Sequence, residues 1–338
     1  MLKIGIIGGG QTGRGFLAQL LAPYSEFVFV DINRTLVNEL EKAGKYTVSF
    51  FDDSMKPVVV SNFRAYIPLD AITELKSCDA VFISVRAENT YNVGLWLHEN
   101  RLDSIPTVVC ENASDPAGLI AGIGINASSG AIFCTTVENG IDINSEGFPF
   151  LYAASEFFPE KLKSFSCFKL TNDFKTLMER KLYTYNAASG IIAYLGAAKG
   201  YDDYAEAAND PDISDELEQF YSEINKAVCS NYGIDIQEQE SFALLSKKKF
   251  QNKAIRDTIL RNAAAPIRKL GPKERLIEPM RLIISQGGNA DPLYKTAAAA
   301  LKYAGAKDKS AAKAILLEAS GMEETDKRVE NILDCFEL

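Results

Sequence analysis

The sequence predicts an α/β fold, in which a doubly wound parallel sheet forms the N-terminal part and a mostly α-helical domain follows it. Two observations carry this prediction. Over the first 140 residues short apolar runs alternate with helical patterns, and from about residue 174 onward apolar residues recur with the helical period. The chain has 338 residues, a length typical of two domains. We expect them at 1–173 and 174–338, with an irregular joining segment at 140–173.

The strands are predicted from runs that are apolar almost throughout, as expected for a parallel sheet covered by helices on both faces. These runs are Leu2–Ile7, Phe27–Val30, Ala80–Val85, Thr107–Val109 and Ala131–Cys134. The helical pattern of the second half predicts helices at 174–199, 214–231, 236–250, 273–286, 293–304, 309–319 and 323–335. The joining segment contains Gly147, Pro149 and Pro159, which interrupt regular structure.

Composition and charge exclude several classes of function. The 36 basic and 45 acidic side chains give a net charge of −9, which disfavours binding to nucleic acid or to an anionic membrane. No apolar stretch approaches the roughly 20 residues of a membrane span, and the N-terminus lacks the pattern of a signal peptide. The six cysteines form no C-x-x-C pair and are interpreted as buried free thiols. We therefore expect a cytoplasmic protein.

A glycine-rich loop follows the first predicted strand. The segment Gly8-Gly9-Gly10-Gln11-Thr12-Gly13 is a G-x-G-x-x-G placed between a strand and an amphipathic helix. In this context Gly8 permits a tight turn, Gly10 lets the backbone approach a pyrophosphate, and Gly13 allows close packing of helix on strand. The amides near Gln11 and Thr12 would face the anion. The first domain is therefore predicted to be a dinucleotide-binding domain of the Rossmann type.

An acidic residue ends the second predicted strand at the position that recognises ribose. Asp31 lies 23 residues after Gly8, where a carboxylate can accept hydrogen bonds from the adenosine ribose hydroxyls. The same carboxylate repels a 2′-phosphate. The predicted cofactor is therefore NAD in preference to NADP.

His98 is the single histidine of the chain, so most imidazole and zinc chemistry is excluded from the outset. The strongest remaining group for proton transfer is Lys181, on the predicted helix that opens the second domain. On an ideal α-helix Asn186 and Ser189 lie roughly 140° and 80° around from Lys181, so the three share one broad face. A lysine acts as a base when burial and nearby cations, here Arg180, lower its pKa. The alternative is that Lys181 is an ordinary lysine on the polar face of a helix, with its charged end in solvent.

A basic stretch lies inside this acidic protein. From Ser241 to Arg281 there are eleven basic and three acidic residues. This contrast favours a small anionic substrate, with Arg261, Arg268 and Lys269 as its candidate ligands. The alternative is a solvated basic surface.

At these residues the sequence resembles the polyol-specific long-chain dehydrogenases, the mannitol dehydrogenase family. The resemblance extends over nearly the whole chain, and five segments carry it. They are Gly10 to Phe16, Cys110-Glu111-Asn112, Glu179 to Gly196, Asn209-Asp210, and Pro266 to Leu270 continuing to Arg275 to Pro279. The family pattern of Lys, Asn five residues later and His three further falls on Lys181, Asn186 and Ser189. The resemblance thus implies that Lys181 is the general acid/base and that Asn186 contacts the oxyanion.

The resemblance also implies that Arg261 and Lys269 contact the substrate, that Asn112 lies near the nicotinamide, and that no metal is used. The chain departs from the family at two substrate contacts. Ser189 stands where relatives have histidine, and Glu138 lies in the segment that supplies a substrate-binding Asp to relatives. The chain is also shorter than typical relatives.

The implied activity is an NAD-dependent interconversion of a sugar alcohol and its ketose, with mannitol 1-phosphate and fructose 6-phosphate as the leading pair. Another polyol, or a hexuronate such as tagaturonate or fructuronate, remains open as the substrate. A catalytically silent NAD-binding regulator is the alternative from another class.

Overall fold

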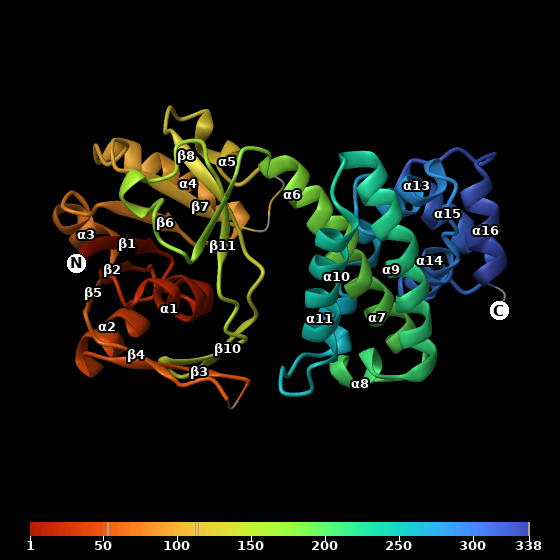
Figure 1. Ribbon diagram of the computed structural model, residues 1–338, viewed down its shortest axis with the longest axis horizontal. Coiled ribbons are helices and arrows are strands. Elements are labelled where there is room, and N and C mark those ends of the chain that lie inside the picture. Colours follow the sequence, from red (N-terminus) through yellow and green to blue (C-terminus); the bar gives the residue numbers. More distant parts are fainter. Residues whose placement is uncertain (53, 112, 114, 337–338) are drawn as a thin grey trace. The chain divides into compact units, whose positions relative to one another are not determined.

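The computed structural model describes residues 1–52, 54–111, 113 and 115–336. The chain divides into two compact units, Met1–Met178 and Glu179–Leu338 (Figure 1). The first unit is a mainly parallel sheet with helices packed on it, and the second is helical. The predicted fold class is therefore confirmed.

The main sheet of the first unit has eight strands in the order β12-β11-β8-β7-β6-β1-β2-β5. Neighbouring strands are parallel except β8 and β11. The strands are β1 (Leu2–Ile7), β2 (Ser25–Val30), β5 (Phe63–Tyr66), β6 (Ala80–Ile83), β7 (Thr107–Cys110), β8 (Ala127–Ala131), β11 (Leu151–Ala154) and β12 (Phe168–Thr171).

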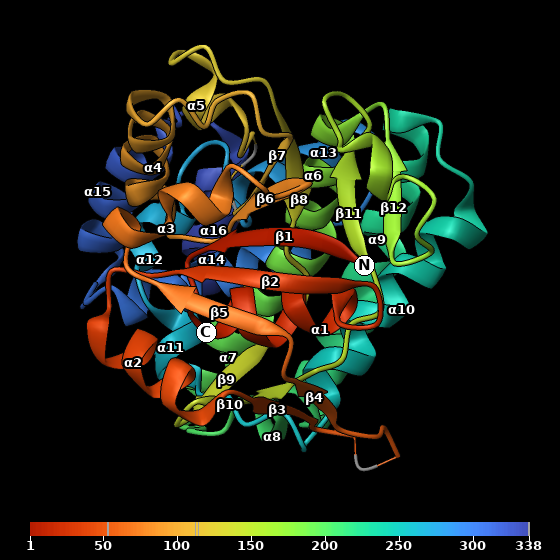
Figure 2. The same cartoon turned by 90° about the vertical axis from the view of Figure 1, so that its left-hand side faces the viewer.

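From β5 through β8 the strand order is that of dinucleotide-binding sheets. The order reverses between β1 and β6, so the carboxyl end of β1 lies at the topological switch point where such folds bind ligands. Figure 2 shows β1 and β2 side by side in the middle of the unit. The helices α3 (Pro68–Leu75), α4 (Ala87–Glu99) and α5 (Gly118–Ala121) bury Leu75, Leu97 and Ile120 against the sheet.

A second, four-stranded sheet was not predicted. It has the order β4-β3-β10-β9 and consists of β3 (Tyr46–Phe50), β4 (Val58–Val60), β9 (Thr136–Asn139) and β10 (Asp142–Ser145). This sheet packs closely on the helix after β1, because a Cβ built on Gly15 would lie 2.3 Å from Ile143 Cγ2. Gly15 is therefore required for the close approach of the two elements.

Two predictions about strands need correction. The segment 140–173 is more regular than expected, since β11 and β12 extend the main sheet and β10 belongs to the second sheet. The strand expected at Ala131–Cys134 lies instead at β8, Ala127–Ala131. Its residues are buried but small or polar, and the Ser128 hydroxyl donates to the Ala154 carbonyl at 2.7 Å. Hydropathy alone could not reveal such a strand.

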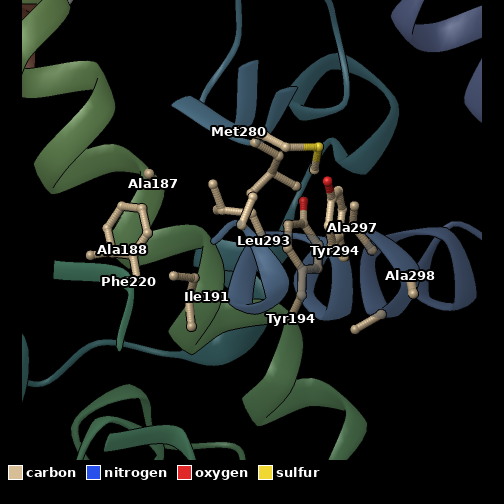
Figure 3. Packing of buried hydrophobic residues seen from close by; sticks show 14 of the residues in the cluster. Ala187, Ala188, Ile191, Tyr194, Phe220, Met280, Leu293, Tyr294, Ala297 and Ala298 are labelled. Atoms are coloured by element: carbon tan, nitrogen blue, oxygen red, sulfur yellow. The ribbon is translucent and has the colours of Figure 1, made fainter. Parts of the chain in front are cut away.

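The second unit is a helical domain with α7 (Ala187–Ala198) at its centre. Around α7 lie the helices α8 (Tyr204–Ala208), α9 (Pro211–Tyr232), α10 (Ile236–Gln251), α11 (Ile259–Ala263), α12 (Pro266–Lys269), α13 (Ile277–Ser285), α14 (Asp291–Tyr303), α15 (Lys309–Ser320) and α16 (Lys327–Phe336). Figure 3 shows Ile191 and Tyr194 of α7 beside Leu293 and Tyr294 of α14. The many alanines on these two helices let them pack closely.

The helix expected at 174–199 is interrupted by a π turn. It consists of α6 (Phe174–Lys181), the π-helical segment η3 (Leu182–Asn186) and α7. None of the helices in the described part of the chain combines the length and hydropathy that a membrane span requires.

Candidate active site

The glycine-rich loop has the geometry that a pyrophosphate site needs. Gly8 has a φ of +97°, and a Cβ there would lie 2.2 Å from the Ser84 carbonyl oxygen. A Cβ on Gly13 would lie 2.2 Å from the Gly8 carbonyl oxygen, so this glycine lets the helix start directly against the strand. A Cβ on Gly10 would meet no atom of the described residues within 4 Å. The backbone is thus tightly constrained on both sides of Gly10 and open at Gly10 itself.

Gln11 and Thr12 are the first helical residues after this loop, and the π-helical segment η1 (Gly13–Leu17) follows them. Asp31 lies at the end of β2, where its Oδ1 accepts a 2.8 Å hydrogen bond from the Asn33 backbone N–H. Its Oδ2 faces the loop, 3.6 Å from where a Cβ on Gly9 would lie. The predicted cofactor residues of the loop and β2 therefore lie together. Asn112, the predicted nicotinamide neighbour, lies outside the described residues.

Arg14, directly after the loop, is completely buried and organises this region. Its Nε donates to the Gly9 carbonyl at 2.6 Å, its Nη1 to the Ile141 carbonyl, and its Nη2 to Glu138 Oε1 at 3.0 Å. Burial lowers the pKa of the Arg14 guanidinium, and nearby Tyr46 and Glu138 offset part of this effect. Glu138, a predicted substrate ligand, is therefore the ion-pair partner of Arg14.

In the second unit Lys181, Asn186 and Ser189 lie around the π turn. Lys181 is the last residue of α6, and only 6% of its surface is exposed. Asn186 and Ser189 are partly exposed. The backbone N–H of Ala187 bonds to the carbonyl of Leu182, five residues earlier. Such a turn holds more residues than an α turn. The angle around the helix axis between Lys181 and Asn186, which are five residues apart, is therefore smaller than the roughly 140° expected on an ideal α-helix.

Arg180 fixes the start of the π turn to α10. Its Nε donates to Gln239 Oε1 and its Nη1 to Glu238 Oε1, both at 2.6 Å, and its guanidinium lies 4.2 Å from the centroid of the Phe242 ring. Gln239 Nε2 in turn donates to Thr184 Oγ1 of the π turn at 3.0 Å. Sequence reasoning assigned Arg180 the role of a cation that lowers the pKa of Lys181. The structure shows that the charge of Arg180 is paired with Glu238.

Lys269 is the most buried of the three predicted anion ligands, with 5% of its residue surface exposed. Its Nζ donates to the Asn262 carbonyl and lies 5.6 Å from the centroid of the Tyr194 ring on α7. Burial, together with repulsion by Arg275 and Arg268, lowers the pKa of Lys269 to about 8. Crowding of this kind favours an anion as a ligand.

The other cations of the basic stretch are partly neutralised by neighbouring carboxylates. Arg261 donates to Asp257 Oδ2 at 2.8 Å, and Arg268 pairs with Glu274. Both arginine side chains are more than half exposed. Arg275 Nε is buried without a hydrogen-bond partner among the described residues, and lies 3.6 Å from Glu274 Oε2. We use the term cationic group for Lys269 and Arg275, which are the less exposed of these cations, together with Arg268 at the protein surface.

Packing of α7 on the following elements brings two predicted groups together. A Cβ on Gly190, next to Ser189, would lie 3.8 Å from Arg275 Cδ, and the Tyr194 hydroxyl donates to the Ala263 carbonyl at 3.1 Å. Ser189 and the cationic group therefore share one region of the second unit. Sequence reasoning did not single out Arg14, Tyr194 or Arg275. Arg14 and Arg275 stand within the segments that carry the family resemblance, which was the available signal.

His98 lies on the surface of the first unit, where its Nδ1 is 3.1 Å from Asp103 Oδ2. Among the described residues no group of three or more His, Cys, Asp and Glu side chains is arranged to hold a metal ion. Metal-independent chemistry stays a prediction.

Comparisons with known proteins agree on the family to which this chain is similar. Residues 173–334 match the family model of the mannitol dehydrogenase C-terminal domain. The chain is 27% identical to mannitol-1-phosphate 5-dehydrogenase of Exiguobacterium sibiricum over 323 residues, which cover 88% of this chain and 84% of that protein. It is 29% identical to the Clostridium acetobutylicum enzyme of the same name over 308 residues, which cover 81% and 80%.

Solved structures show the same fold. A ternary complex of Pseudomonas fluorescens mannitol 2-dehydrogenase with NAD and D-mannitol matches with a TM-score of 0.72, at 14% identity, over 99% of this chain and 91% of that one. A substrate-free D-sorbitol dehydrogenase matches with a TM-score of 0.78, at 15% identity, over 99% and 92%.

Proposed function

Because the chain belongs to the mannitol dehydrogenase family, we propose that it is an NAD-dependent oxidoreductase that interconverts a sugar alcohol and its ketose. The names of the relatives support mannitol 1-phosphate and fructose 6-phosphate as the pair. The observation that carries the proposal is the position of Lys181, which is buried directly before the π turn that ends at Asn186 and precedes Ser189. We place the reaction in the cytoplasm.

The residues of the first unit fit a dinucleotide. The loop is open at Gly10, where a pyrophosphate would approach the backbone, and closed at Gly8 and Gly13. Asp31 Oδ2 is directed toward the loop, as a ribose ligand should be. When bound, NAD supplies the acceptor or donor of the hydride.

The residues of the second unit would move the proton. In alcohol oxidation Lys181 Nζ takes the hydroxyl proton of the substrate, and in ketose reduction the protonated amine returns it. Asn186 donates a hydrogen bond from its side-chain amide to the same oxygen, where negative charge develops. Asn186 remains partly exposed and so accessible to substrate, while Lys181 is largely shielded from water.

The buried Lys269 and the partly buried Arg275 favour an anionic group on the substrate. A sugar phosphate satisfies this requirement. A hexuronate carboxylate such as that of tagaturonate or fructuronate also satisfies it, and is the second candidate substrate. An unphosphorylated polyol would bring no anionic group to these cations.

Replacement of the proposed base tests the mechanism. Lys181→Ala should lower turnover by at least ~100-fold, the usual scale for losing a positioned acid/base, with NADH affinity nearly unchanged. Lys226→Ala is the matched control, because Lys226 is an exposed lysine of the same unit that pairs with Glu223. Its turnover should stay at the wild-type level. A Lys181→Ala enzyme as fast as wild type would refute the assignment.

A substrate panel tests the activity itself. Ketose phosphates, free ketoses and hexuronates are each assayed for oxidation of NADH and of NADPH. We expect turnover of fructose 6-phosphate with NADH. If the protein binds NADH but turns over none of these sugars, it is a regulator that senses the dinucleotide.

A further inference from the structure

A phenol hydroxyl is buried in the second unit without a partner. Tyr204, the first residue of α8, is 5% exposed, and its hydroxyl forms no hydrogen bond with any described residue. Buried hydroxyls in proteins nearly always have a hydrogen-bond partner, so an exception needs an explanation. Two other buried tyrosines near α7 have partners: the Tyr194 hydroxyl donates to the Ala263 carbonyl at 3.1 Å, and that of Tyr221 lies 2.7 Å from Ser246 Oγ.

The position of Tyr204 is firmly determined by its surroundings. Its backbone N–H donates to the Asp257 carbonyl at 3.1 Å, and its ring packs nearly perpendicular to that of Phe250, with 5.8 Å between the centroids. The preceding Asp203 caps α8 by accepting from the Glu206 N–H. The phenol ring is therefore held in place by its backbone bond and by packing.

Ser189 of α7 lies close to this hydroxyl. Helices α7 and α8 pack together, since a Cβ on Gly196 would lie 2.9 Å from Ala207 Cβ. Burial raises the pKa of the Tyr204 phenol, and the nearby Ser189 hydroxyl offsets part of the rise. Both hydroxyls are thus close together, although they do not meet hydrogen-bond geometry in this conformation. Ser189 itself is partly exposed, on the same helix as Asn186.

We propose that Tyr204 is a positioning residue whose hydroxyl donates to Ser189 Oγ, so that Ser189 donates its own hydrogen to the reacting oxygen of the substrate. This inference rests on the proposed function, and it identifies a residue that no comparison assigns. A helical serine otherwise turns its hydroxyl to the carbonyl four residues earlier. A donor fixed behind Ser189 keeps the serine hydrogen available for the substrate. Because its pKa is raised, the phenol remains a donor throughout the physiological pH range.

A double-mutant cycle tests the coupling. Tyr204→Phe keeps the ring packing and removes only the unpartnered hydroxyl. It should lower kcat for ketose reduction about tenfold, the scale of one hydrogen bond, and leave NADH affinity and the melting temperature unchanged. Ser189→Ala should lower kcat by at least as much. In the Ser189→Ala background Tyr204→Phe should have no further effect, because the tyrosine acts through the serine.

Tyr221→Phe is the matched control, since Tyr221 is an equally buried tyrosine beside a serine. It should lower the melting temperature and leave kcat unchanged. The inference is overturned if Tyr204→Phe retains wild-type kcat, or if its effect persists undiminished in the Ser189→Ala background. A wild-type protein that turns over none of the sugars would instead remove the proposed function, and this inference with it.

Discussion

At the scale of single residues, Lys269 shows how burial changes the chemistry of a side chain. An exposed lysine is fully charged at any physiological pH, whereas the pKa of Lys269 is lowered to about 8 by burial and by the arginines beside it. Below pH 8 the amine is protonated and can bind an anion, and above pH 8 it is neutral. Its pKa in the folded protein lies below the ordinary lysine value of 10.5. Folding the charged form is therefore unfavourable below pH 8, and this cost disappears as the pH rises toward 10.5.

This titration predicts a pH dependence of substrate binding. The KM for fructose 6-phosphate should rise as the pH increases from 7 to 9, because Lys269 loses its charge within that interval. Lys269→Met should raise the KM at pH 7 by about tenfold or more, the scale of a lost charged hydrogen bond, and should abolish its increase above pH 8. Steady-state kinetics across this interval measure both effects. If the increase is unchanged in Lys269→Met, another group is responsible for it.

At the scale of elements, Gly10 and Gly13 of one loop differ in what surrounds them. The same substitution by alanine is therefore predicted to affect stability at Gly13 and NADH binding at Gly10. Gly13→Ala places a methyl group 2.2 Å from the Gly8 carbonyl oxygen, so it should lower the free energy of unfolding by about 1–3 kcal/mol, as overpacking does. The methyl group of Gly10→Ala meets no atom within 4 Å in the described part of the chain, so this substitution should leave stability unchanged. It should nevertheless weaken NADH binding, because its methyl group occupies the approach of the pyrophosphate.

Denaturant unfolding and NADH titration of both variants measure these effects. The expectation for Gly10 is wrong if Gly10→Ala binds NADH as tightly as wild type, and the packing argument is wrong if Gly13→Ala is as stable as wild type.

The elements also differ in how visible they are in the sequence. The strand β1 coincides with its predicted bounds because all its residues except Lys3 and Gly5 are large and apolar. The strand β8 was misplaced because it consists of alanine, serine and glycine, which form a strand between β7 and β11 without raising the hydropathy. The π turn in the helix at 174–199 was invisible for another reason. One additional residue in a turn hardly disturbs an apolar pattern that continues on both sides of it.

At the scale of the whole molecule, the two units have separate cores and separate parts of the proposed chemistry. The core of the first unit lies between the sheet and α3, α4 and α5, and that of the second surrounds α7 and α14. The dinucleotide residues belong to the first unit, and the cationic group belongs to the second. Each ligand should therefore stabilise the unit that binds it.

Hydrogen exchange along the chain measures this division. NADH at 100 times its Kd should slow exchange in β1, η1 and β2 by up to about 100-fold, since binding at that excess stabilises by about 2.7 kcal/mol. The helices α7, α11 and α12 should respond only when a sugar phosphate is added. Equal protection of these helices by NADH alone would contradict the assignment of ligands to units.

The site as a whole was predictable where it depends on local sequence. The spacing of Gly8 to Gly13 and of Lys181 to Asn186 is fixed within one turn or helix, so a pattern can identify it. The pairing of Arg14 with Glu138 joins residues 124 positions apart, and a single sequence contains no signal of it. The same holds for the approach of Tyr204 to Ser189, which depends on the packing of α7 on α8.

The two π turns have a consequence for how this chain can vary in length. Each lies beside one of the predicted sites, η1 after the glycine-rich loop and η3 between Lys181 and Asn186. Deleting one residue from η3 would restore a regular α turn, and Lys181 and Asn186, then four residues apart, would lie roughly 40° from each other around the helix and still share a face. A regular α-helix that kept all the residues would separate them by roughly 140°. The chain can therefore lose a residue here, provided that the π turn is lost with it.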